Sequence, residues 1–115
     1  MQKSDLYAII AANRMKDQFI IEDDMAEIIL TIKNKVGLHA RPASLFVQAA
    51  NKFKSDIRIT NIGSNVTANA KSILNVLTLG ANQGCEIRMN AEGEDADQAL
   101  AALKELFDSN FGENE

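Results

Sequence analysis

The chain changes from a strand pattern to a helix pattern at residues 36–43, which read Val36-Gly37-Leu38-His39-Ala40-Arg41-Pro42-Ala43. Gly37 permits the backbone angles of a tight turn. Pro42 is tolerated in the first turn of a helix, because the amide groups there have no intrahelical acceptor. The stretch therefore predicts a helix that begins at about Ala40, with His39, the only histidine of the chain, at its start.

The residue types at this predicted helix start suit a transferred anion. Backbone N–H groups without acceptors and the positive end of the helix dipole favour negative charge beside Ala40 and Arg41. The Arg41 guanidinium adds a fixed cation whose planar fork of donors matches a phosphate. A neutral imidazole offers a ring nitrogen as a nucleophile. The pattern predicts a phosphoryl group carried on His39, although a lone histidine in such a place is more often only a polar cap.

Periodicity outside this stretch predicts the remaining elements. Alternating apolar residues from Ile28 to Ile32 indicate a strand with one buried face. Apolar residues spaced by three and four after the turn predict a helix over 40–54. Further strands are expected over 57–62, 66–68 and 85–92, a short helix capped by Ser72 over 72–77, and a last helix over 96–107. The polar tail from Ser109 is expected to fray.

This order of elements predicts an α/β (α+β) fold. Three of the strands have one apolar and one polar face, so the helices must cover a single side of the sheet. We expect an open-faced sandwich, in which a four-stranded antiparallel sheet carries three helices on one face. The domain would span 25–115, and residues 1–24 would be an amino-terminal extension. A short amphipathic helix over 4–17 in that extension would pack on the domain or dock a partner, unless residues 1–24 are translated sequence upstream of the real start.

Composition excludes several classes of function. A net charge of −4 over 115 residues, with no basic run, argues against a nucleic-acid partner. Cys85 is the only cysteine, so neither an internal disulfide nor a cysteine-based zinc cluster can form. No stretch has the roughly 18–20 consecutive apolar residues of a membrane span, and charged residues interrupt any candidate secretory signal. We expect a cytoplasmic monomer without a metal or an organic cofactor.

Residues 25–108 resemble HPr, the histidine-containing phosphocarrier family of the phosphoenolpyruvate-dependent sugar phosphotransferase system. The stretch from Gly37 to Ala43 is similar to the active-site signature of that family. A second stretch is similar to its regulatory-serine signature and reads Lys71-Ser72-Ile73-Leu74-Asn75-Val76-Leu77-Thr78-Leu79-Gly80-Ala81. The family fold, a four-stranded antiparallel sheet with helices on one face, agrees with the periodicity.

The resemblance implies a role for each of these stretches. His39 would accept a phosphoryl group on Nδ1 from phosphoenolpyruvate-charged enzyme I and pass it to IIA components of sugar transport. The backbone amides of Ala40 and Arg41, with the Arg41 side chain, would hold the phosphoryl oxygens. Ser72 would be modified by an HPr kinase/phosphorylase, which would weaken acceptance at His39 and create a surface for a transcriptional regulator.

The short helix after Ser72 is too apolar to bury all of its side chains in a small domain. We expect part of it to form a docking patch near His39. The residues assigned to this patch are Ser44, Leu45, Ile73, Leu74 and Leu77. Leu74 is the expected exposed anchor, while Ile73 and Leu77 are also candidates for the core.

Two other functions compete with a phosphocarrier. The first is a purely regulatory binding module, a corepressor or sensor acting through phospho-Ser72. Relatives of that kind lack the histidine, so the presence of His39 argues against this as the sole role. The second is an enzyme with His39 as general base, and here the sequence offers neither a partner carboxylate nor a second histidine.

Overall fold

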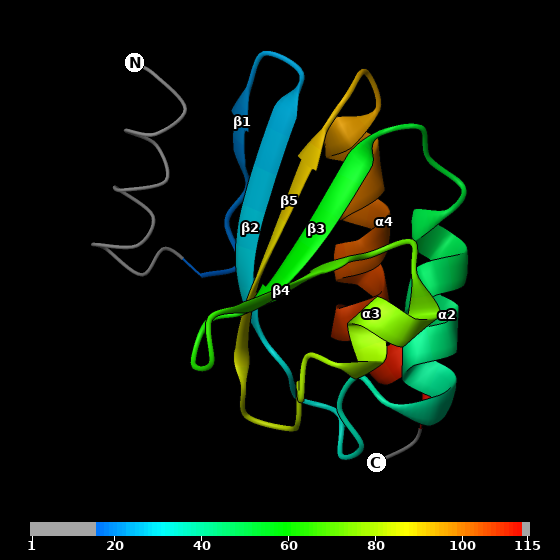
Figure 1. The fold of residues 1–115 in the computed structure, drawn as a ribbon. Helices are drawn as coiled ribbons and strands as arrows, with labels where there is room; N and C mark the ends of the chain where they lie inside the picture. Colours follow the sequence, from blue (N-terminus) through cyan, green and yellow to red (C-terminus); the bar gives the residue numbers. More distant parts are fainter. Residues whose placement is uncertain (1–15, 114–115) are drawn as a thin grey trace.

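The computed structural model describes residues 16–113, in which a five-stranded antiparallel sheet carries helices on one face (Figure 1). The strands are β1 (Ile20–Glu22), β2 (Met25–Thr31), β3 (Asp56–Asn61), β4 (Val66–Asn69) and β5 (Glu86–Glu92). The helices are α2 (Ala40–Ala50), α3 (Ile73–Leu77) and α4 (Ala96–Asp108), followed by the 3-10 turn η1 (Asn110–Gly112). The strand order is β1-β2-β5-β3-β4. The predicted open-faced α+β sandwich is confirmed.

The prediction of four strands is wrong, because β1 adds a fifth within the segment taken as an extension. Ile21 of β1 pairs with Ala26 of β2, and the turn between the strands places Asp23 at a φ of 53°. A strand of three residues is too short to show an alternating pattern, which is why the sequence did not reveal it. The predicted helix over 4–17 lies outside the described residues except for its end, where Lys16 instead forms a parallel bridge with Ile29.

The alternating pattern of β2 predicts one buried face, but both faces of this strand are buried. Met25 to Leu30 are all buried, including Ile29 and Glu27 on the face that the helices do not cover. Pairing with β1 and the Lys16 bridge make β2 an interior strand of the sheet. Interior position alone does not explain this burial, because β5 is also an interior strand and keeps an alternating pattern.

Glu27 is the unusual member of this strand, because its side chain is only 2% exposed. Its Oε1 lies 3.9 Å from Nε of Arg88, and its Oε2 accepts no hydrogen bond from the described residues. Burial raises the pKa of Glu27 to about 7, and the nearby Arg88 charge opposes that shift. The carboxyl therefore changes its charge near neutral pH.

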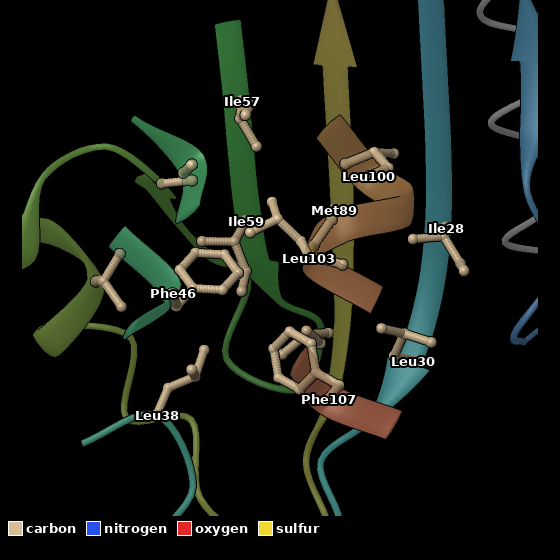
Figure 2. Close-up of a cluster of buried hydrophobic side chains, with 14 of the residues drawn as sticks. Ile28, Leu30, Leu38, Phe46, Ile57, Ile59, Met89, Leu100, Leu103 and Phe107 are labelled. Atoms are coloured by element: carbon tan, nitrogen blue, oxygen red, sulfur yellow. The ribbon is translucent and has the colours of Figure 1, made fainter. Parts of the chain in front are cut away.

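The core lies between the sheet and helices α2 and α4, and Figure 2 shows apolar side chains from three strands meeting those of the two helices. Its labelled members from the sheet are Ile28, Leu30, Ile57, Ile59 and Met89, and those from the helices are Phe46, Leu100, Leu103 and Phe107. Burying one such side chain contributes about 1.5–3 kcal/mol. This packing sets the position of α2, and with it the place where α2 begins.

Residues 109–113 do not fray as the polar tail predicts. Phe111 in η1 is 1% exposed, and its ring packs edge-on against Phe107 with the centroids 5.0 Å apart. Asn110 and Phe111 both have a positive φ, which turns the chain back onto the core. One aromatic residue therefore anchors a tail that is otherwise polar.

Candidate functional site

His39 stands at the start of α2, as predicted. It is the residue before the helix, with an extended backbone (φ −130°, ψ 164°), and α2 begins at Ala40. Its half-buried side chain makes no capping hydrogen bond to the helix. Instead, Nε2 of the imidazole lies 2.8 Å from Oδ1 of Asn82. The ring is thus held from outside its own helix.

The loop before His39 is packed tightly against the loop that contains Asn82. The amide of Leu38 donates to the carbonyl of Ala81 at 2.8 Å. Gly37 has a φ of +66°, and a Cβ at this position would lie 2.3 Å from the Ala81 oxygen and 2.8 Å from Cα of Asn82. Any larger residue would therefore separate the two loops. The predicted role of Gly37 in a tight turn is confirmed, and its close contact is an additional constraint.

The first turn of α2 leaves amides directed out of the helix. The amide of Ala43 donates to the His39 carbonyl at 3.4 Å, which closes the first helical turn. The backbone N–H groups before that position have no acceptor within the helix. Pro42 has no N–H group, so the N–H groups of Ala40 and Arg41 are the ones available to bind a ligand. Ala40 has a φ of +48°. For a residue other than glycine this conformation costs on the order of 1 kcal/mol, and such strain is common at functional sites.

Arg41 is tied to the carboxyl-terminal turn. Its Nη1 donates to the carbonyl of Phe111 at 2.9 Å, although the two residues are 70 positions apart. The acceptor is a neutral carbonyl, so the guanidinium keeps its full positive charge and its other donors. The side chain is otherwise exposed. The sequence contains no signal for this contact, because the tail is expected to fray.

Ser72 caps the second helix start, as predicted. It precedes α3 with an extended backbone (φ −114°, ψ 114°), and its Oγ accepts a hydrogen bond from the amide of Asn75 at 3.3 Å. α3 packs against α2 and continues the surface on the same side of the molecule (Figure 1). The side chain of Ser72 is half-buried.

The residues assigned to docking differ in exposure. Leu74 is 74% exposed, while Ile73 and Leu77 are about 40% exposed, and Val76 is the buried residue of α3. Ser44 and Leu45 on α2 are half-buried. Val36 was not among the residues expected in the patch, but it is 47% exposed in the loop before His39. Ile73, Leu74 and Leu77 together form the exposed apolar surface of α3, called the α3 patch below.

The ionisable groups with shifted pKa values lie elsewhere. At the start of α4, the Ser55 hydroxyl donates to the Asp95 carboxylate and lowers its pKa, with help from the amides of Lys54 and Ser55. Glu27 lies on the sheet face away from the helices. Within residues 16–113, no group of three or more His, Cys, Asp or Glu side chains is placed to hold a metal ion. None of the helices described there is long and apolar enough to cross a membrane.

An open-faced sandwich with a histidine and an arginine at a helix start is compatible with a protein that carries phosphoryl groups. The family model for the PTS HPr component phosphorylation site matches residues 26–109. The chain belongs to this HPr family of the phosphotransferase system, whose members are phosphocarriers and not catalytic enzymes.

Individual relatives agree with the family match. The chain is 46% identical over 90 residues to the phosphocarrier protein HPr of Xylella fastidiosa, an alignment that covers 78% of this chain and 99% of the relative. A crystal structure of HPr from Thermoanaerobacter tengcongensis is similar with a TM-score of 0.74 and 48% identity, over 77% of this chain and 98% of that one. Crh of Bacillus subtilis, described as a catabolite repression protein crystallised as a swapped dimer, has a TM-score of 0.53 and 36% identity, over 75% and 95% of the two chains.

Proposed function

We propose that His39 accepts a phosphoryl group on Nδ1 from phosphoenolpyruvate-charged enzyme I and passes it to IIA components of sugar transport. The carrier would act as a cytoplasmic monomer without a metal or an organic cofactor. The observation that supports this most directly is the position of His39. Its side chain stands at the start of α2 without capping it, where the amides of Ala40 and Arg41 have no acceptor within the helix.

The local geometry suits a group that must be held and then released. The amides of Ala40 and Arg41 can donate to phosphoryl oxygens, and the helix start favours their negative charge. Arg41 offsets the developing charge while the Phe111 carbonyl retains one of its donors. A clamp that used every donor would stabilise the phosphorylated ground state and slow the next transfer.

The test is transfer between purified proteins. The full chain is incubated with phosphoenolpyruvate and enzyme I, and the modified residue is mapped by mass spectrometry and by phosphorus NMR of the intact protein. We expect acid-labile phosphate on Nδ1 of His39, which is lost when a IIA component is added. Absence of phosphate, or phosphate on another residue, would contradict the proposal.

We also propose that Ser72 is phosphorylated by an ATP-dependent HPr kinase/phosphorylase. A phosphate there would add about −1.5 to −2 charges beside the α3 patch. This charge would repel a phosphorylated donor and weaken acceptance at His39, and it would provide a feature for a transcriptional regulator to bind. Ser72 is half-buried, and its Oγ bond to Asn75 is long at 3.3 Å, which supports access by a kinase.

Incubation with such a kinase and ATP, followed by mapping of the phosphate, tests this second site. Phosphate on Ser72 with slower acceptance at His39 is the expected result. A chain modified at Ser72 that takes no phosphate from charged enzyme I would favour the purely regulatory alternative. A chain left unmodified by the kinase would reduce Ser72 to a helix cap.

A further inference from the structure

The side chain that holds the His39 ring comes from a loop 43 residues further along the chain. We infer that Asn82 is a positioning residue, which keeps the ring proton of His39 on Nε2 and so presents Nδ1 as the nucleophile. This inference rests on the proposed phosphoryl acceptance at His39. It adds to the proposed site a residue that lies outside both sequence signatures. It also gives a physical reason why Nδ1 of His39, and not Nε2, would accept the phosphoryl group.

The argument begins with the chemistry of the two partners. A neutral imidazole has one nitrogen that donates and one that accepts, and an amide oxygen can only accept. Oδ1 of Asn82 lies 2.8 Å from Nε2, so Nε2 must carry the proton for this contact to be a hydrogen bond. Nδ1 then carries the lone pair. The attacking nitrogen is therefore set before any donor arrives.

Asn82 can impose this choice because its backbone is held on several sides. The carbonyl of Ala81 accepts the Leu38 amide at 2.8 Å, directly next to His39. The carbonyl of Asn82 accepts the Cys85 amide at 3.1 Å, and the Gly84 amide donates to Ile32 at 2.8 Å. A Cβ on Gly37 would lie 2.8 Å from Cα of Asn82, so the two loops approach each other closely here. These contacts hold the Asn82 backbone next to His39 and place its amide oxygen opposite the ring.

The same bond assists the transfer step. The Nδ1 lone pair forms a bond to phosphorus while the bond from phosphorus to the donor breaks, and the leaving atom of the donor keeps that electron pair. The proton stays on Nε2, so the ring becomes a cation, and its hydrogen bond to Asn82 strengthens as the charge develops. In the onward transfer the Nδ1–P bond breaks and its electron pair returns to Nδ1. The ring leaves as a neutral imidazole that is ready for another cycle.

The expected effect on rate is moderate, because Asn82 is exposed and water can replace part of the bond. A hydrogen bond to a group that becomes charged in the transition state is worth about a tenfold change in rate. Asn82→Ala should therefore accept phosphate from charged enzyme I about tenfold more slowly than the native chain. Its melting temperature should be unchanged, since the side chain is not part of the core.

The decisive readout is the protonation of the ring, measured by nitrogen-15 NMR of the full-length protein with labelled histidine. The native chain should show the proton on Nε2, and Asn82→Ala should show a measurable fraction with the proton on Nδ1. Asn82→Asp keeps an acceptor oxygen and should restore the Nε2–H signal. Gln83→Ala is the matched control, because Gln83 is the adjacent amide side chain and donates to the Lys33 carbonyl instead.

These outcomes separate the inference from the proposed function. A proton on Nδ1 in the native chain would overturn the inference, as would Asn82→Ala with an unchanged signal or an unchanged rate of acceptance. A native chain that takes no phosphate from charged enzyme I would instead overturn the proposed function. The NMR signal would still report whether Asn82 holds the ring.

Discussion

Helices α2 and α3 both begin after a residue with an extended backbone, but the two residues use their side chains in opposite ways. Ser72 caps its own helix, since Oγ accepts the amide of Asn75 three residues later. His39 makes no such bond, and its ring is held by Asn82 from another loop. A helix start can therefore serve the stability of its own helix or remain open to a ligand. α3 is closed by its cap, and α2 keeps amides available for an anion.

The two helix starts also differ in how much of the chain builds them. The Ser72 cap is complete within residues 72–75. The surroundings of His39 need Asn82, and those of Arg41 need Phe111 from the carboxyl-terminal turn. A local cap is stable wherever its helix forms, whereas the start of α2 has its full set of groups only in the folded domain.

Substitution of His39 should have the strongest effect on phosphate acceptance. His39→Ala should abolish acceptance of phosphate from charged enzyme I, because it removes the nucleophile. The unfolding free energy should change by less than about 0.5 kcal/mol, since the side chain is half-buried and caps nothing. Acceptance is measured by acid-labile phosphate and stability by denaturant titration. Continued incorporation of phosphate in the variant would show that His39 is not the acceptor, and the start of α2 would then have no special role.

A pH experiment on either helix start needs a correction for Glu27. The folded chain keeps the Glu27 proton up to about pH 7, while the unfolded chain releases it near the ordinary value of 4.5. The stability linked to this proton is therefore fully present below about pH 4.5 and is lost as the pH rises through 7. Glu27→Gln cannot ionise, so it should be more stable than the native chain at pH 8 by about 3 kcal/mol.

Denaturant titrations of both chains between pH 4.5 and 8 measure this difference. The two curves should converge at the acid end and separate toward pH 8. Parallel curves across the range would show that Glu27 stays ionised in the folded chain. In that case any pH dependence of acceptance could be assigned to the site without correction.

The α3 patch should matter for partners more than for stability. Leu74→Asp places a charge on the most exposed residue of the patch and should slow transfer from enzyme I about tenfold, as expected for a contact near the centre of an interface. Its melting temperature should stay within a few degrees of the native value. Ile21→Asp is the matched control, because Ile21 is an exposed apolar residue on β1 at the opposite edge of the sheet from β4. A larger loss of stability than of transfer rate would place Leu74 in the fold and not in an interface.

The smallest effect is expected at the cap itself. Ser72→Ala should lower the unfolding free energy by about 1 kcal/mol, the usual cost of losing an N-cap hydroxyl. Acceptance at His39 should remain within about twofold of the native rate. Ser72→Asp keeps a capping oxygen, so it should recover most of the stability while it slows acceptance by adding negative charge. If Ser72→Ala itself lowered acceptance tenfold, the two helix starts would be coupled and not independent.

The amino-acid pattern predicted those features that depend on neighbouring residues. The turn at Gly37, the start of α2 at Ala40 and the Ser72 cap all follow from residue types within a few positions of each other, and the structure confirms them. β1 could not be predicted, because a strand of three residues is too short to show an alternating pattern of apolar and polar residues. The anchored tail was missed because burial of Phe111 depends on Phe107 and not on the polar residues around it.

The sandwich, the family and the two helix starts can all be predicted from the sequence, because periodicity, caps, turns and motifs are local properties. Three other features depend on the folded domain: which nitrogen of His39 is bonded, what holds Arg41, and the raised pKa of Glu27. Each of these depends on groups brought together from distant positions by the closing of the core. Hydrogen bonding and desolvation act over a few ångströms in space, and sequence distance contains no record of them.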